Sequence, residues 1–283
     1  MNNIYNFSNN SSFISQVHLF EVVLLSVLFL SIGSFVSTLI LRLEPSISLK
    51  ISNILFRRSN CSNCKKNISF INLIPIVGYL KQFGKCQNCK KNISIFYPLT
   101  EAIFCLVGII IFNEYGISIF SIYLFLIFTV FYILFFLDLK YFYLPLPLNL
   151  SILVLGFTGN TFFNFATDST ILFFDITPLM FSLMGFICGY SFLWIVNSIY
   201  RFLNNIDGIG GGDFILLGGI GSIIGPLSLG IVLFMAASLG IIYYILKGTL
   251  NQKELPLGSF IILGGILYFF IKKFELFQNL TVI

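Results

Sequence analysis

Two aspartates lie at the ends of long apolar runs, where a charged side chain is costly. Asp138 ends the apolar run 131–137, and Asp213 precedes the apolar run that begins at Phe214. An ionisable residue in a membrane span is a functional hypothesis by default. Two carboxyl groups that converge on one water can share a proton. The ionised group then takes a proton from water while the protonated group polarises a carbonyl. Asp138 and Asp213 are therefore candidates for aspartic-protease chemistry.

Each aspartate also has a structural alternative. Asp138 can be an interfacial charge paired with Lys140, although an acid at a helix C-terminus opposes the helix dipole. Asp213 follows four glycines within residues 208–212, which allow close backbone approach and positive φ angles. The alternative for Asp213 is the N-cap of the helix that follows this loop. A phosphate-binding loop is excluded, because no GK[ST] signature follows the glycines.

Four cysteines form two pairs that suit a metal ion. The pairs are Cys61-x2-Cys64 and Cys86-x2-Cys89, separated by 21 residues. Four thiolates at this spacing can bind one structural Zn²⁺ in a tetrahedral site. Neighbouring lysines are expected to stabilise the thiolates, and four reduced thiols or redox pairs are the alternative. The expected apolar core of this segment is small and consists of Ile71, Leu73, Ile74, Ile76, Val77 and Leu80.

The composition places these groups in a membrane protein. Of 283 residues, 57% are hydrophobic and only 10% are charged, which is too few to cover a soluble globular domain. This excludes a cytosolic enzyme, a disordered chain and a secreted disulfide scaffold. Apolar runs long enough to be membrane spans predict about eight helices. They cover residues 17–41, 97–113, 117–137, 147–165, 177–200, 214–226, 228–247 and 257–272, with one long kinked helix around Gly225-Pro226 as an alternative to two.

The predicted fold is an all-α polytopic membrane protein with three parts. Residues 1–41 hold the N-terminal segment and first span, residues 42–94 a zinc-ribbon-like tetracysteine domain, and residues 95–283 the remaining spans. Ten of the 16 Lys and Arg residues lie between Arg42 and Lys91, which places this domain in the cytoplasm. Both aspartates then lie at the cytoplasmic membrane edge. The basic residues meet lipid headgroups, and no aromatic pattern indicates nucleic acid binding.

The motifs in this order resemble the bacterial prepilin peptidases, also called type IV leader peptidases or GxGD aspartic proteases. Asp138 with Pro145 resembles the family's first catalytic motif, and Gly210-Gly211-Gly212-Asp213 resembles its GxGD motif. Asp207 stands where family members usually carry Glu. Further similar segments are Gly33-Ser34-Phe35, Arg42-Leu43, the four cysteines, Ile74-Pro75, Gly84-Lys85-Cys86, Ile93-Ser94, Tyr97-Pro98-Leu99 with Glu101, and Leu216-Leu217.

The resemblance implies a multi-pass protein of the bacterial inner membrane that cleaves the basic leader from type IV prepilins and type II secretion pseudopilins. It implies Asp138 and Asp213 as catalytic residues and a metal site at the four cysteines. It also implies a second activity, N-methylation of the new N-terminus with S-adenosylmethionine. Residues expected to support the substrate or the loop are Gly210, Gly211, Gly212, Asp207 and Glu101.

Three positions depart from the family pattern, and each loses a charge. Leu146 replaces an Asp, Ile215 replaces a Lys, and Phe96 replaces an Arg. Two other classes of function stay open, and the lost charges favour the first of them. One is a non-catalytic assembly factor of a pilus or secretion system that binds through its zinc segment. The other is a transporter with an aspartate relay, which the absence of acids near mid-bilayer disfavours.

Overall fold

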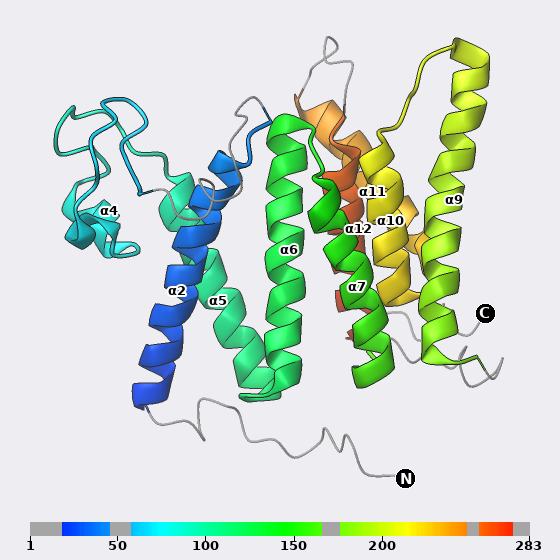
Figure 1. The fold of residues 1–283 in the computed structure, drawn as a ribbon, viewed down its shortest axis with the longest axis horizontal. Coiled ribbons are helices and arrows are strands. Elements are labelled where there is room, and N and C mark those ends of the chain that lie inside the picture. The colour runs from blue at the N-terminus through cyan, green and yellow to red at the C-terminus, as the bar shows by residue number, and fades with distance from the viewer. Residues whose placement is uncertain (1–18, 46–57, 166–175, 248–254, 274–283) are drawn as a thin grey trace. The chain divides into compact units, whose positions relative to one another are not determined.

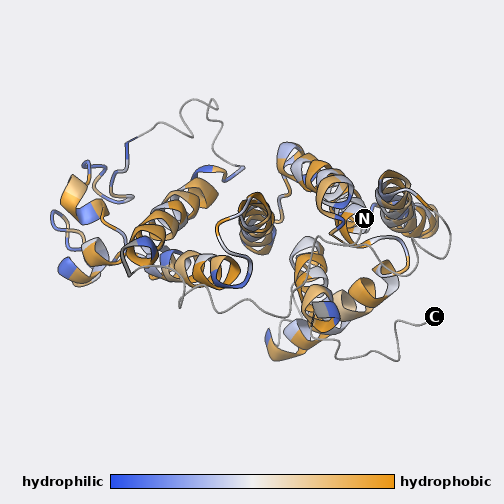
Figure 2. Cartoon of the chain, turned by 90° about the horizontal axis from the view of Figure 1, so that it is seen from below, coloured by the Kyte–Doolittle hydropathy of each residue, from blue (hydrophilic) through white to orange (hydrophobic). Residues whose placement is uncertain are grey.

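The computed structural model describes residues 19–45, 58–165, 176–247 and 255–273. These residues are mostly helical, except that residues 58–95 consist largely of turns with two short helical elements. Two isolated β-bridges, Asn60 with Asn67 and Lys85 with Asn92, lie in the cysteine segment. The chain forms two compact units, Met1–Thr129 and Val130–Ile283, and the division falls inside one helix. Figure 2 shows that apolar residues dominate the helices, as the composition predicts.

Eight apolar helices confirm the predicted all-α membrane fold. Six of those described are long and apolar enough to cross a membrane, and α10 and α12 are shorter. Gly225, with a φ of 85°, ends α10, and Pro226 follows, so this region holds two helices and not one kinked helix. The helices are α2 (Leu19–Arg42), α5 (Phe96–Tyr115), α6 (Ile119–Tyr141), α7 (Leu146–Phe163), α9 (Pro178–Asn204), α10 (Gly211–Ile224), α11 (Leu229–Lys247) and α12 (Leu257–Lys273).

In the first unit, α2 and α5 pack side by side (Figure 1). Small residues allow this close approach, because a Cβ atom on Gly108 would lie 2.5 Å from the ring of Phe29. Phe29 also packs against Phe112 and Phe125, with ring centroids 5.2 and 4.8 Å apart. The cysteine segment between these helices carries the short elements η1 (Phe70–Leu73) and α4 (Val77–Lys81).

In the second unit, α10 packs against α7, α9 and α12 (Figure 1). Nearly every residue of α10 from Asp213 onward is buried. A Cβ atom on Gly185 of α9 would lie 2.0 Å from the carbonyl oxygen of Gly221, so the two backbones touch. Asn160 of α7 donates hydrogen bonds to Ser182 Oγ at 2.9 Å and to the Ser222 carbonyl at 2.8 Å. These contacts surround the short helix with protein and fix the position of its first turn.

Candidate functional site

Asp138 lies in the last turn of α6 and is only 5% exposed. Its Oδ2 accepts two hydrogen bonds from Ser259 in the first turn of α12. The backbone N–H donates at 2.6 Å and the hydroxyl lies at 2.9 Å. The same hydroxyl is 3.0 Å from the Phe135 carbonyl oxygen. Asp138 is therefore held from a distant part of the chain, and these partners differ from the Lys140 pairing considered from sequence.

Asp213 is the third residue of α10 and is 9% exposed. The N-cap is Gly210, whose carbonyl accepts a hydrogen bond from the Asp213 N–H at 3.0 Å. The N-cap alternative for Asp213 is therefore wrong. A carboxylate in the first helical turn interacts favourably with the helix dipole. Oδ1 of Asp213 is buried without a hydrogen-bond partner from the protein, so it can interact with a bound molecule.

Gly258, at the start of α12, separates the two carboxyl groups. A Cβ atom built on Gly258 would lie 3.0 Å from Oδ1 of Asp213 and 3.2 Å from Cγ of Asp138. It would also lie 2.8 Å from Cδ1 of Leu144. Both carboxyl groups thus border the same point, which in this chain holds no side chain. The two carboxyl groups therefore lie close to each other, and a water held between them would be within reach of both, as general acid-base chemistry requires.

The glycine-rich loop before α10 is held by a buried asparagine of α9. Oδ1 of Asn197 accepts hydrogen bonds from the N–H groups of Gly208 and Ile209, both at 2.9 Å. Its Nδ2 donates to Asp207 Oδ1 at 3.1 Å. Asp207 also lies 3.7 Å from Arg201, and both of these side chains are exposed. Asp207 is thus a fixed part of the loop.

The expectation of positive φ angles in this loop is wrong. Among the described glycines, only Gly84, Gly116 and Gly225 have positive φ. The loop uses glycine for close approach, because a Cβ atom on Gly212 would lie 2.9 Å from Cβ of Leu144. A Cβ atom on Gly211 would meet nothing within 4 Å. The loop therefore needs small residues at particular positions and not an unusual backbone.

The four cysteines form a cluster that fits a metal ion. The Sγ atoms of Cys61, Cys64, Cys86 and Cys89 all lie within 4.8 Å of one another. Cys61 Sγ and Cys89 Sγ are 3.8 Å apart. A tetrahedral zinc site with Zn–S distances of about 2.3 Å has sulfur atoms about 3.8 Å apart. The donor set and its spacing therefore suit Zn²⁺, and the cluster lies between the first and second spans, as predicted.

The two cysteine pairs adopt the same turn. The Cys61 N–H donates to the Lys66 carbonyl at 3.0 Å, and the Cys86 N–H donates to the Lys91 carbonyl at 2.9 Å. A repeat missed in our sequence analysis explains this. Residues 61–69 and 86–94 read CSNCKKNIS and CQNCKKNIS, and they differ at one position. Each repeat therefore builds one half of the cluster.

Backbone groups of these turns shift the thiol pKa values. The backbone N–H of Lys91, followed by the side chain of Asn63, lowers the pKa of Cys89 to about 6. The largest effect thus comes from an amide and not from the lysine ammonium groups that the sequence suggested. The backbone N–H of Lys66 acts to lower the pKa of Cys64, but loss of water and the other thiols raise this pKa to about 11. A metal ion would remove this mutual repulsion by binding all four thiolates.

The predicted apolar core of the cysteine segment is wrong. Ile71, Ile74, Val77 and Leu80 are exposed, and Leu73 and Ile76 are half-buried. A segment of this size buries too little apolar surface to fold well by itself. This strengthens the case for a metal ion as its main source of stability.

Glu101 lies in the first unit, whereas both aspartates lie in the second. It is buried in α5, and its Oε2 accepts a hydrogen bond from the Ile76 N–H at 2.7 Å. Ile76 has a φ of 59°, which is strained for a β-branched residue. Glu101 therefore fastens the cysteine segment to α5 by satisfying the amide of a strained residue.

Two family profiles match the two parts of the chain that carry the candidate sites. Residues 27–115 match the profile of the bacterial peptidase A24 N-terminal domain, and residues 124–245 match the type IV leader peptidase family. The chain is 30% identical over 228 residues to the prepilin leader peptidase/N-methyltransferase of Dichelobacter nodosus, covering 80% of this chain and 75% of the relative. The chain belongs to the type IV leader peptidase family.

Other relatives of the type IV leader peptidase family carry the same name and match over greater lengths. The prepilin leader peptidase/N-methyltransferase of Neisseria gonorrhoeae is 29% identical, covering 88% of this chain and 90% of the relative. That of Vibrio cholerae is 28% identical, covering 88% and 96%. No solved structure matches the chain. With its apolar helices, this leader peptidase family member is a multi-pass membrane protein.

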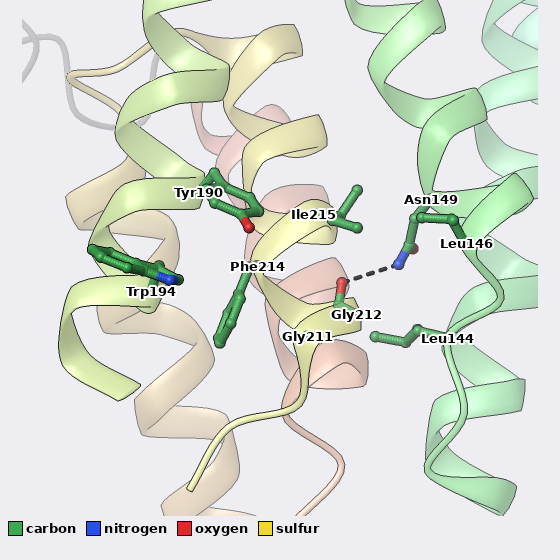
Figure 3. A pocket seen from close by; sticks show the side chains of 9 residues that line it. All are labelled: Leu144, Leu146, Asn149, Tyr190, Trp194, Gly211, Gly212, Phe214 and Ile215. Carbon is green, nitrogen blue, oxygen red and sulfur yellow. Dashed lines mark hydrogen bonds between the residues drawn. The ribbon is translucent and has the colours of Figure 1, made fainter. Parts of the chain in front are cut away.

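The structure adds residues that the family motifs do not include. Ser259 and Gly258 lie beyond the matched residues 124–245, and an ordinary Leu-Gly-Ser-Phe helix start gave no signal of their role. Asn149, also missed, donates from Nδ2 to the Gly212 carbonyl at 3.0 Å (Figure 3). Two of the three departures from the family pattern, Leu146 and Ile215, line a cavity of about 520 Å³ beside this bond.

Proposed function

We propose that this chain cleaves the leader peptide from type IV prepilins and pseudopilins, with Asp138 and Asp213 as the catalytic pair. The observation that carries the proposal is that both carboxyl groups border the same point beside Gly258. Family membership and the names of the relatives support the choice of substrate. Like charges so close cannot both ionise easily, so the pair shares one proton.

In this mechanism a water lies between the two carboxyl groups. The ionised carboxylate takes a proton from the water, and the oxygen forms a bond to the scissile carbonyl carbon. The protonated carboxyl group stabilises the developing oxyanion by donating a hydrogen bond. The C–N bond then breaks, and the leaving amine takes up the proton that the carboxylate removed from the water. Ser259 keeps Oδ2 of Asp138 occupied, which leaves Oδ1 to face the water.

We also propose that the catalytic pair and the cysteine segment face the cytoplasm of a bacterial cell at its inner membrane. The concentration of basic residues between Arg42 and Lys91 supports this orientation. We propose residues 42–94 as a domain with a structural Zn²⁺ on its four cysteines, between residues 1–41 and 95–283. The ion would stabilise the turns and takes no part in peptide cleavage.

We propose N-methylation of the new N-terminus as a second activity, because the relatives are named as both leader peptidases and N-methyltransferases. S-adenosylmethionine would supply the methyl group. Two cavities among the described residues, one beside α10 and one in the cysteine segment, do not fit it. The first has no charged lining residue to pair with its charged groups, and the second, of about 120 Å³, holds only about four waters. We therefore derive no step through this cofactor.

The test is to co-express the chain with a prepilin and follow leader loss by gel mobility and mass spectrometry. We expect Asp138→Asn and Asp213→Asn each to abolish cleavage while the protein still accumulates in the membrane. Glu114→Gln, which changes an exposed acid of α5, is the control and retains cleavage. Unchanged cleavage by either aspartate variant would exclude the catalytic pair and favour the assembly-factor alternative. A methyl group on the mature N-terminus would establish the second activity.

A further inference from the structure

The cavity beside α10 lies next to the catalytic pair in the second unit. Three segments surround it: Leu144 and the start of α7, the middle of α9, and the first turns of α10 (Figure 3). Its lining includes Gly212 and Phe214, the residues on either side of Asp213. Its volume of about 520 Å³ is within the range of pockets that bury most of a ligand's surface.

The lining of this cavity is apolar and uncharged. Tyr190 and Trp194 contribute aromatic rings from α9, and Leu146 and Ile215 contribute aliphatic groups from α7 and α10. None of the nine lining residues labelled in Figure 3 carries a charge. A basic leader peptide would find no carboxylate here, so this lining suits an uncharged, apolar segment of the substrate and not its leader.

Asn149 places an unpaired polar atom at this cavity. Its side chain is fully buried and lines the cavity, with Nδ2 committed to the Gly212 carbonyl. Oδ1 of Asn149 is buried and has no hydrogen-bond partner in the protein. Buried acceptors are nearly always paired, so an unpaired one at a cavity is placed to accept a hydrogen bond from a molecule that enters the cavity. A peptide N–H is such a donor, whereas a lipid acyl chain has none.

We propose that this cavity binds the apolar residues that follow the scissile bond, and that Asn149 Oδ1 accepts a hydrogen bond from one of their peptide N–H groups. The proposal rests on the proposed peptidase function. An apolar side chain of the substrate then packs between Trp194 and Leu146, while the scissile bond lies at the carboxyl groups. Asn149 links the bound substrate to the carboxyl groups, because its Nδ2 donates to the carbonyl of Gly212, the residue before Asp213.

The first arm of the test measures side-chain coupling in the purified full-length protein. Alanine is placed in turn at each of the first four mature positions of a prepilin, and kcat/KM for cleavage is compared. At one position we expect a loss of about tenfold with the parent protein. That loss should nearly disappear with Trp194→Ala, which removes the matching surface. Leu203→Ala is the control, because this exposed residue of α9 lies outside the cavity and should preserve the tenfold loss.

The second arm measures the backbone hydrogen bond. Synthetic prepilin peptides carry a single N-methylated amide at each of these positions, which removes one N–H donor. With the parent protein we expect one position at which methylation lowers kcat/KM about tenfold beyond its effect with Asn149→Ala. Asn149→Ala also removes the hydrogen bond to the Gly212 carbonyl, whichever peptide is cleaved. That loss therefore cancels when the methylated and unmethylated peptides are compared.

The proposal would be overturned if, at every position and in both arms, the effect of the substrate change were the same for the parent protein and for the variant. Cleavage by the parent protein in those experiments would leave the proposed peptidase function intact. A Trp194→Ala defect that is equal for all substrates and is reversed by added lipid would assign the cavity to lipid and would also overturn it. Failure of the parent protein to cleave any prepilin would instead remove the proposed function, and this inference with it.

Discussion

Gly258→Ala adds one methyl group at the point where the two carboxyl groups meet. Its Cβ atom would lie 3.0 Å from Oδ1 of Asp213 and 3.2 Å from Cγ of Asp138. Both separations are tighter than ordinary van der Waals contact, so the side chains must move apart by a few tenths of an ångström. The Cβ atom would also lie 2.8 Å from Cδ1 of Leu144, so the methyl group pushes on the side chains around both carboxyl groups.

The expected loss in activity follows from these distances. Catalytic groups must be held within about 0.5 Å of the productive geometry, and a 1 Å displacement can cost about 100-fold. Displacement of the carboxyl groups by a few tenths of an ångström should lower kcat/KM about 10- to 100-fold, equivalent to about 1.4–2.7 kcal/mol. The assay is prepilin cleavage by purified protein, quantified by mobility shift over time.

Gly230→Ala is the matched control, because a Cβ atom there meets nothing within 4 Å. This glycine lies in α11, so alanine should raise helix stability by about 0.5–1 kcal/mol and leave cleavage unchanged. Membrane accumulation of both variants is measured alongside cleavage. Parental activity in Gly258→Ala, at equal protein level, would refute the conclusion that the two carboxyl groups act at this point.

Three further changes test the supports of the candidate sites. Ser259→Ala removes the hydroxyl from the Asp138 carboxyl group but keeps the 2.6 Å backbone bond, so we expect a loss of about 10- to 100-fold in kcat/KM. Ser238→Ala is the control and should retain cleavage, because its hydroxyl bonds within α11, to the Phe234 carbonyl at 2.8 Å. Glu101→Ala should raise hydrogen exchange at the Ile76 amide at least about tenfold, and an unchanged exchange rate would contradict its role as a fastener. Cys61→Ser should lower the zinc content of purified protein from one ion per chain towards none, measured by elemental analysis, and a parent protein free of zinc would favour reduced thiols.

The helices could be predicted from sequence because membrane spans carry their own signal. Long apolar runs ended by Arg42, Lys140 or Lys247 set their limits, and Gly225-Pro226 correctly marked the short turn between two helices. Such signals are local and depend little on tertiary contacts. For the same reason, the cysteine spacing alone predicted that four thiols would cluster.

The supports of the two carboxyl groups could not be predicted. Ser259 is 121 residues away from Asp138 along the chain, and no local pattern distinguishes it from other serines in apolar helices. The prediction of an apolar core in the cysteine segment was wrong for a related reason. Residues such as Ile71 and Leu80 are apolar, but a segment organised by its turns and cysteines leaves them exposed. Burial depends on tertiary packing, which a hydrophobic pattern does not specify.

The hydrogen bonds from Ser259 have a consequence for shortened versions of this protein. A gene interrupted after codon 247 would still encode both aspartates, all four cysteines and every residue matched by the two family profiles. Its product would lack α12, and with it the donors to Asp138 and the glycine between the carboxyl groups. If Asp138 acts as proposed, such a product would be inactive, so the presence of the last helix is a better criterion for a working gene than the motifs alone.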